Sequence, residues 1–90
     1  MNFSQALEQV KAGCRIARQG WNGKGMFIVL QPGYPDGVQA NANTATAFGL
    51  VEGSRVSVRP YIAMWTVDQQ IVPWVASQTD LLADDWEIAQ

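Results

Sequence analysis

The sequence has no histidine and a single cysteine, Cys14. Without a histidine as its base, Cys14 is expected to be a small packing residue near a helix end and not a nucleophile. One cysteine cannot form an internal disulfide, which suits a reducing cytoplasm. Because zinc sites rely on these two residue types, the sequence predicts no metal site, and we expect no cofactor.

Long apolar runs are missing as well. No stretch approaches the roughly 18 apolar residues that a membrane helix needs. The first residues, MNFSQALEQVKAG, are amphipathic and include Glu8, so they do not resemble a signal peptide. We therefore expect a cytoplasmic protein with no membrane partner.

Combinations of catalytic groups are also missing. No nucleophile stands beside a base, and no carboxylate pair has a spacing suited to acid–base catalysis. Asp84 and Asp85 are adjacent in the sequence, so their side chains should point apart. The glycines of GWNGKG are not followed by the Lys-Ser/Thr pair of a P-loop. We expect no catalytic residues, and hence a protein that is not an enzyme.

Charge is divided unevenly along the chain, whose formal net charge is −2. Most of the basic residues lie near the start, and half of the acidic residues lie in 80–90. The basic residues are too few for the positive stripe that duplex binding requires, so we expect no DNA or RNA partner. The early ones, Lys11, Arg15, Arg18 and Lys24, are enough for a ligand with one or two phosphates.

The length of 90 residues predicts one domain, 1–90. A domain of this size buries only about 60–65% of the surface of its unfolded chain. Since no disulfide compensates, association of copies is a natural way to bury more surface. We expect a homo-oligomer.

The chain opens with the spacing of an amphipathic helix over 3–12, with Phe3, Ala6, Leu7 and Val10 on one face. Asn2 or Ser4 could cap this helix, and Gly13 should end it. A hairpin should follow, with a short strand between Arg15 and Arg18, a turn at GWNGKG and a strand at MFIVLQ.

The segment 32–53 is the least regular part. PGYPDG predicts a loop, and NANTATAFGL predicts a short helix capped by Asn41 or Asn43 and closed by Gly49. So long a connection in a small domain is usually functional or part of an interface.

Strands are predicted in RVSVRPYIAMWTV, with a break at Pro60, and in a second hairpin, TVDQQIVPW. Ser77 and Asp80 form a capping box before LLA, and DWEIA can add a last strand. The predicted fold class is α+β: an N-terminal helix packed on an antiparallel β-sheet, with short helical insertions and the helices on one face.

Several residues have both a structural and a functional interpretation. Trp21, at a hairpin tip, could anchor a ligand or fold back over the sheet edge. Asn22 beside glycines is favoured as a turn residue, and Arg15 and Arg18 are more often solvated surface residues than phosphate ligands. Trp74 is placed at the mouth of a loop by Pro73 and the polar SQTD.

Three long stretches carry a family resemblance: GWNGKGM, QPGYPDG and VPWVASQTDLLADDW. With ANANTATAFGL and RPYIAMWTVDQQI they resemble the small phage and prophage proteins of the second Thoeris anti-defence type, over residues 3–89. The resemblance implies a protein that binds and sequesters cyclic ADP-ribose isomers, immune signals of the host bacterium, without degrading them. It also implies homotetramers, ligand pockets shared between subunits and, in some members, separate pockets for cyclic dinucleotides.

The resemblance further implies which residues meet the ligand. One wall would contain Trp21, Asn22, Met26 and Phe27, and the other Trp74, Ser77, Thr79 and Asp80. Arg18 would bind phosphate. For Ser77 and Asp80 the spacing alone favours the capping role, and only the resemblance favours ligand contact. Two alternatives remain open, a cyclic-nucleotide hydrolase and a phage structural or interaction module.

Overall fold

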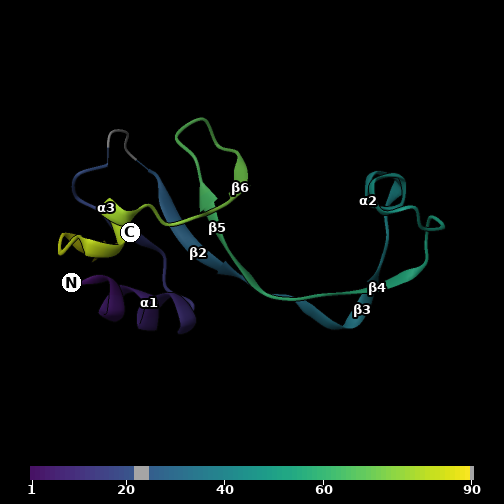
Figure 1. Ribbon diagram of the computed structural model, residues 1–90, viewed down its shortest axis with the longest axis horizontal. Helices are drawn as coiled ribbons and strands as arrows, with labels where there is room; N and C mark the ends of the chain where they lie inside the picture. The colour runs from purple at the N-terminus through teal and green to yellow at the C-terminus, as the bar shows by residue number, and fades with distance from the viewer. Residues whose placement is uncertain (22–24, 90) are drawn as a thin grey trace.

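The computed structural model describes residues 1–21 and 25–89 of the chain. Figure 1 shows its elements, which are α1 (Phe3–Lys11), β1 (Ile16–Arg18), β2 (Phe27–Gln31), β3 (Tyr34–Gln39), α2 (Ala42–Phe48), β4 (Arg55–Val58), β5 (Tyr61–Trp65), β6 (Ile71–Pro73), α3 (Gln78–Leu82) and β7 (Trp86–Ile88). One antiparallel sheet has the strand order β6-β5-β2-β1-β7, and β3 pairs with β4 in a separate ribbon. The predicted α+β class is confirmed.

Helix α1 begins at a reciprocal pair of hydrogen bonds. The Gln5 amide donates to Asn2 Oδ1 at 2.9 Å, and the Asn2 amide donates to Gln5 Oε1 at 3.0 Å. This capping box satisfies two amides that lack partners within the helix, so Asn2 and not Ser4 is the cap. Gly13 follows the helix with φ +95°, a left-handed conformation that favours glycine and ends the helix as predicted.

The core lies between α1 and one face of the five-stranded sheet. Ala6 and Val10 of α1 are buried against Ile16, Ile28 and Trp86, which come from β1, β2 and β7. Burying a large apolar side chain contributes about 1.5–3 kcal/mol, so this contact holds helix and sheet together. The predicted packing of the N-terminal helix on the sheet is confirmed.

The opposite face of the sheet carries Phe27 and Val29 of β2, paired with Trp65 and Ala63 of β5. Successive side chains of a strand point to opposite faces, so these four point away from the side where Ile28 meets α1. No helix in the described parts of the chain packs on them. We call this surface the open face.

Residues 32–60 form an arm that extends from the rest of the described chain, the body (Figure 1). The arm makes the molecule elongated, with principal extents of 45 × 26 × 25 Å. At its base, a Cβ added to Gly33 would lie 2.2 Å from the carbonyl oxygen of Val58. The missing side chain of Gly33 therefore permits the two backbones to approach each other.

Two predictions for this segment are wrong. PGYPDG is not a loop throughout, because β3 begins at its third residue, Tyr34, which pairs with Val58 of β4. A proline is tolerated on a strand that lacks a neighbour on one side, so Pro35 does not prevent the ribbon. The helices do not all lie on one face of a single sheet either, since α2 sits at the far end of the arm (Figure 1).

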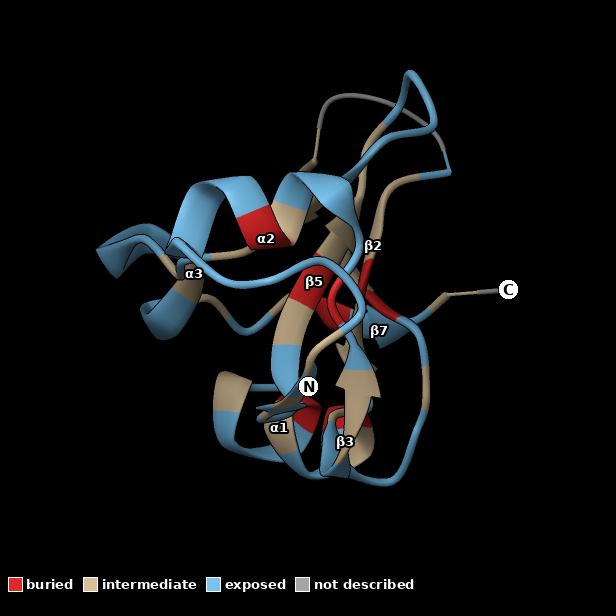
Figure 2. Cartoon of the chain, turned by 90° about the vertical axis from the view of Figure 1, so that its right-hand side faces the viewer, coloured by how far each residue is buried: buried red, intermediate tan, exposed pale blue. Residues whose placement is uncertain are grey.

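The prediction of α2 itself is confirmed. The Thr44 amide donates to Asn41 Oδ1 at 2.8 Å, and Gly49 ends the helix with φ +69°. Figure 2 shows that most of α2 is exposed. Ala45 is its buried residue, while Phe48 is 74% exposed. The helix thus has little packing of its own.

Candidate ligand-binding site

A hollow of about 500 Å³ opens beside the turn that leads from β1 to β2, with β7 on its other side. We call it the Trp21 hollow. It is lined by Ala17, Arg18, Gln19, Trp21, Gly25, Met26, Phe27, Glu87, Ile88 and Ala89. Its volume lies within the roughly 300–1,000 Å³ of small-molecule sites. Four of the predicted ligand residues, Arg18, Trp21, Met26 and Phe27, are therefore together, and Asn22 lies outside the described residues.

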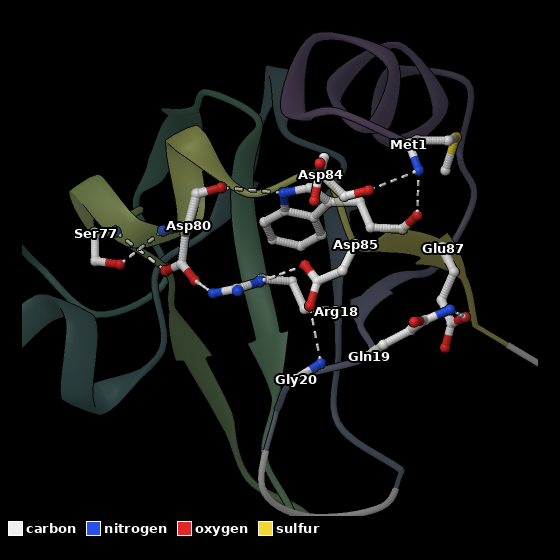
Figure 3. Close-up of polar contacts among 10 residues, drawn as sticks. Met1, Arg18, Gln19, Gly20, Ser77, Asp80, Asp84, Asp85 and Glu87 are labelled. Carbon is white, nitrogen blue, oxygen red and sulfur yellow. Dashed lines mark hydrogen bonds and ion pairs between the residues drawn. The ribbon is translucent and has the colours of Figure 1, made fainter.

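Arg18 bridges two carboxylates (Figure 3). Its Nε donates to Asp85 Oδ1 and its Nη1 to Asp80 Oδ1, each at 2.9 Å. The side chain is only 16% exposed, so it is not the solvated surface arginine of the structural interpretation. The hydrogen bonds to Asp85 and then Asp80 raise the pKa of the guanidinium, which therefore remains a cation. Whether it binds phosphate stays a prediction.

Asp85 ties the start of β7 to the turn before Trp21. Its Oδ2 accepts a hydrogen bond from the Gly20 amide at 3.0 Å, and its carbonyl oxygen accepts one from the Gln19 amide at 3.1 Å. The hydrogen bond from Arg18 is the main cause that lowers the pKa of Asp85, and the Gly20 amide acts in the same direction. The carboxylate is therefore ionised at neutral pH.

Asp80 has the capping role that its spacing predicts. The Asp80 amide donates to Ser77 Oγ at 3.0 Å, and the Ser77 amide donates to Asp80 Oδ2 at 3.1 Å. Partial burial acts to raise the pKa of Asp80, but hydrogen bonds from Arg18 and Ser77 outweigh it and lower the pKa. The cap is confirmed, while ligand contact by Ser77 or Asp80 stays a prediction.

An aromatic cluster supports the hollow from behind. Trp86 is buried, and its ring packs on three other aromatic rings. The distances between ring centroids are 5.5 Å to Phe3, 5.4 Å to Trp21 and 6.0 Å to Trp74. The Trp21 contact is edge-to-face, a favourable geometry for aromatic rings. Trp21 thus folds back onto the core and also lines the hollow, so its two interpretations do not exclude each other.

The second predicted wall does not line the Trp21 hollow. Trp74 packs on Phe3 and Trp86, and Ser77 and Thr79 are exposed near the start of α3. Asp80 connects this wall to the hollow through its ion pair with Arg18. The two walls are therefore joined through the Arg18–Asp80 ion pair and through Trp86, on which both Trp21 and Trp74 pack, and not across a common cavity.

Sequence reasoning missed the contribution of β7 to the hollow. Glu87 and Ile88 line it because β7 pairs with β1, placing Glu87 opposite Ala17. Glu87 Oε2 also accepts a hydrogen bond from Gln19 Nε2 at 3.1 Å. DWEIA was predicted as a strand, but nothing in the sequence indicated its neighbour. Asp85 was missed for the same reason.

Among residues 1–21 and 25–89, no three His, Cys, Asp or Glu side chains are grouped so that they could hold a metal ion. Within the same residues, no helix is long and apolar enough to cross a membrane.

Comparison with known proteins places the chain in a family. The family model of the Thoeris anti-defense 2-like domain matches residues 1–89. A protein of Bacillus phage SP01 described as Thoeris anti-defense 2 is 38% identical over 91 aligned residues. That alignment covers 98% of this chain and 93% of the phage protein.

Proposed function

We propose, since this chain belongs to the Thoeris anti-defense 2-like family, that it acts against bacterial defence by binding and sequestering a cyclic nucleotide signal. The ligand class is that of cyclic ADP-ribose isomers, with cyclic dinucleotides as further candidates. The protein would act in the cytoplasm, by lowering the free concentration of the signal below what its effector needs. The observation that carries this proposal is the Trp21 hollow of about 500 Å³.

The chemistry of the hollow suits a nucleotide. Trp21, Met26 and Phe27 offer apolar surface to an adenine, and aromatic stacking on a base contributes about 1–3 kcal/mol. Arg18 has five N–H groups, of which the two carboxylates occupy two. We assign the remaining N–H groups to the pyrophosphate, and Asn22 to the same wall of the site.

The ribose-binding role is assigned to Trp74, Ser77, Thr79 and Asp80. Ser77 and Thr79 are exposed and carry hydroxyls, which can both donate and accept hydrogen bonds. Since Arg18 contacts both Asp80 and the hollow, a ligand that extends past this arginine would reach the second wall.

We further propose that the protein works as a homotetramer. Two surfaces favour association of copies, the open face of the sheet and the arm. The arm is a two-stranded ribbon with one short helix, and an isolated two-stranded hairpin is at best marginally stable. For a tetramer, light scattering gives a molar mass of about four times the 9.9 kDa of one chain, and a monomer at micromolar concentration would contradict the proposal.

Titration calorimetry against a panel of cyclic ADP-ribose isomers and cyclic dinucleotides tests the function. The expected result is saturable binding of at least one isomer, which Trp21→Ala weakens by at least tenfold. Tyr61→Ala is the matched control, because Tyr61 pairs with Gln31 at the other end of β2 and lies outside the Trp21 hollow. No binding by any member of the panel would overturn the proposal.

Sequestration without turnover needs a separate measurement. The bound ligand is released by heating the protein and analysed by chromatography after hours of incubation. Intact ligand in stoichiometric amount is expected. Conversion of the ligand to a linear product would instead identify a hydrolase.

A further inference from the structure

Asp85 contacts the Arg18 side chain and the backbone directly before Trp21, two residues that line the Trp21 hollow. Its Oδ1 accepts a hydrogen bond from Arg18 Nε, and its Oδ2 accepts one from the amide of Gly20, directly before Trp21. We propose that Asp85 is a positioning residue, which fixes the Arg18 guanidinium and the Trp21 indole relative to each other for ligand binding. This inference rests on the proposed function of the hollow.

While these hydrogen bonds are intact, the backbone and the ring of Trp21 are restricted in their conformation. The Trp21 amide donates to the Arg18 carbonyl oxygen at 3.3 Å, which closes the turn from 18 to 21. Asp85 fastens this turn to β7 from outside, and the next residue, Trp86, supplies the surface on which the Trp21 ring rests at 5.4 Å. Two adjacent residues of the body thus set the backbone and the ring of Trp21.

Gly20 gives independent support. Its φ lies outside the left-handed region that favours glycine, so the backbone does not require a glycine here. A Cβ at this position would lie 3.1 Å from Asp85 Oδ2 and 3.8 Å from Arg18 Nη2. The missing side chain therefore leaves the room that the Asp85 carboxylate occupies.

The neighbouring Asp84 provides a matched control. Its carbonyl oxygen accepts a hydrogen bond from the Met1 ammonium group at 3.4 Å, but its carboxylate has no partner among the described residues. Asp84 is exposed, so Asp84→Asn removes the same charge one residue away without touching the turn.

The first experiment needs no ligand. In protein labelled with 5-fluorotryptophan, each of the four tryptophans gives a fluorine resonance that a Trp→Phe variant assigns. Asp85→Asn is expected to shift or broaden the Trp21 resonance and leave that of Trp65 unchanged. Asp84→Asn should move neither. A Trp21 resonance unaffected by Asp85→Asn would overturn the inference.

The second experiment is a double-mutant cycle with the cyclic ADP-ribose isomer that binds the wild type most tightly. Asp85→Asn should weaken binding by about tenfold, which corresponds to one hydrogen bond to a charged group. In the Trp21→Ala background the same change should cost much less, about threefold or below, because one of the two groups that Asp85 positions is gone and only the effect on Arg18 remains. Equal losses in both backgrounds would overturn the role.

Gly20→Ala completes the test, since it disturbs the same contact and keeps every charge. We expect Gly20→Ala to weaken binding and to shift the Trp21 resonance in the same direction as Asp85→Asn does. If Asp85→Asn does not fold, Gly20→Ala replaces it in both experiments. An unchanged affinity and resonance in Gly20→Ala would argue against positioning. If no isomer binds the wild type, the proposed function fails, while the fluorine spectra still decide whether Asp85 positions Trp21.

Discussion

The body and the arm differ in what they bury. The largest fully buried side chains are Trp86, Ile16, Ile28 and Val10, and all of them belong to the body. In the arm, the buried residues are Ala40 and Ala45, while Phe48 and Val51 are 74% and 79% exposed. The body therefore has a hydrophobic core of its own, and the arm presents apolar side chains that a second copy of the chain could cover.

The two regions also differ in how their polar groups are used. In the body, Arg18 joins the α3 cap to the turn before Trp21 through Asp80 and Asp85. In the arm, Arg55 donates to the backbone oxygens of Asp36 and Gly37 at 3.4 and 3.3 Å, and it is exposed. Side-chain hydrogen bonds thus join distant elements in the body, whereas Arg55 binds only the backbone of its own ribbon. Under the proposed function, the body would hold the ligand and the arm would serve assembly.

The largest expected effect comes from breaking the body core. Trp86→Ala should lower the free energy of unfolding by about 3–5 kcal/mol, because it leaves a cavity beneath Trp21, Trp74 and Phe3. It also removes the hydrogen bond from Trp86 Nε1 to the Asp80 carbonyl oxygen, 3.0 Å long. Urea unfolding measures the loss. The half-buried Trp65 is the control, and an equal loss in Trp65→Ala would contradict this account.

The second largest effect is expected from acid, which should lower the stability of the body. The pKa values of Asp80 and Asp85 lie below the ordinary 3.8, so the folded state binds protons less readily than the unfolded chain. Their contribution to stability is complete above about pH 4 and is lost as the pH falls through the lowered values. Arg18, with a raised pKa, does not titrate in this range.

The measurement is the melting temperature between about pH 5 and 2. It should fall more steeply in the wild type than in the double variant Asp80→Asn/Asp85→Asn, which has lost both titrating groups. Asp36→Asn, which removes an exposed carboxylate of the arm, is the control for the loss of a charge. Parallel profiles for wild type and double variant would contradict the prediction.

The helix caps offer a matched comparison of smaller size. Ser77→Ala should cost about 1 kcal/mol, measured by urea unfolding, because the cap of α3 is tied to the body through Asp80 and Arg18. Asn41→Ala removes the equivalent cap of α2, which contacts no helix or strand of the body in the described chain. Its effect should be limited to faster amide exchange in the arm. An equal loss of global stability in both variants would show that arm and body unfold together.

The smallest effect on the body is expected from Phe48→Ser. This exposed arm residue should change the body's free energy of unfolding by less than about 0.5 kcal/mol. The same change should lower the mass measured by light scattering if the arm mediates association. An unchanged mass would assign assembly to the open face instead, where Val29→Asp is the corresponding variant.

Local patterns predicted most of the fold. The stripe of Ala6 and Val10, the caps at Asn41 and Ser77 and the last strand were readable because each depends on residues a few positions apart. The strand in PGYPDG was not predicted, because the turn preference of its residues is outweighed by pairing with β4, about twenty positions away in the sequence. Local propensity contains no information about so distant a pairing partner.

For the candidate site, the residue types were predictable from the sequence, but their spatial neighbours were not. Trp21, Met26 and Phe27 meet in one hollow as predicted from the family resemblance, but the wall of Trp74, Ser77 and Thr79 lies outside it. Asp85 was interpreted as one of two adjacent acids pointing apart. Its contacts with Arg18 and Gly20 span 67 and 65 positions of the sequence.

The sequence by itself determined the α+β class, the capping box of Ser77 and Asp80, the absence of histidine chemistry and the family to which the chain belongs. Only the tertiary structure decided that 32–60 projects as an arm and that Arg18 is held between Asp80 and Asp85. The reason is the range of the interactions. Periodicity and capping act within about one helical turn, whereas strand pairing and ion pairs join residues whose approach depends on how the whole chain folds.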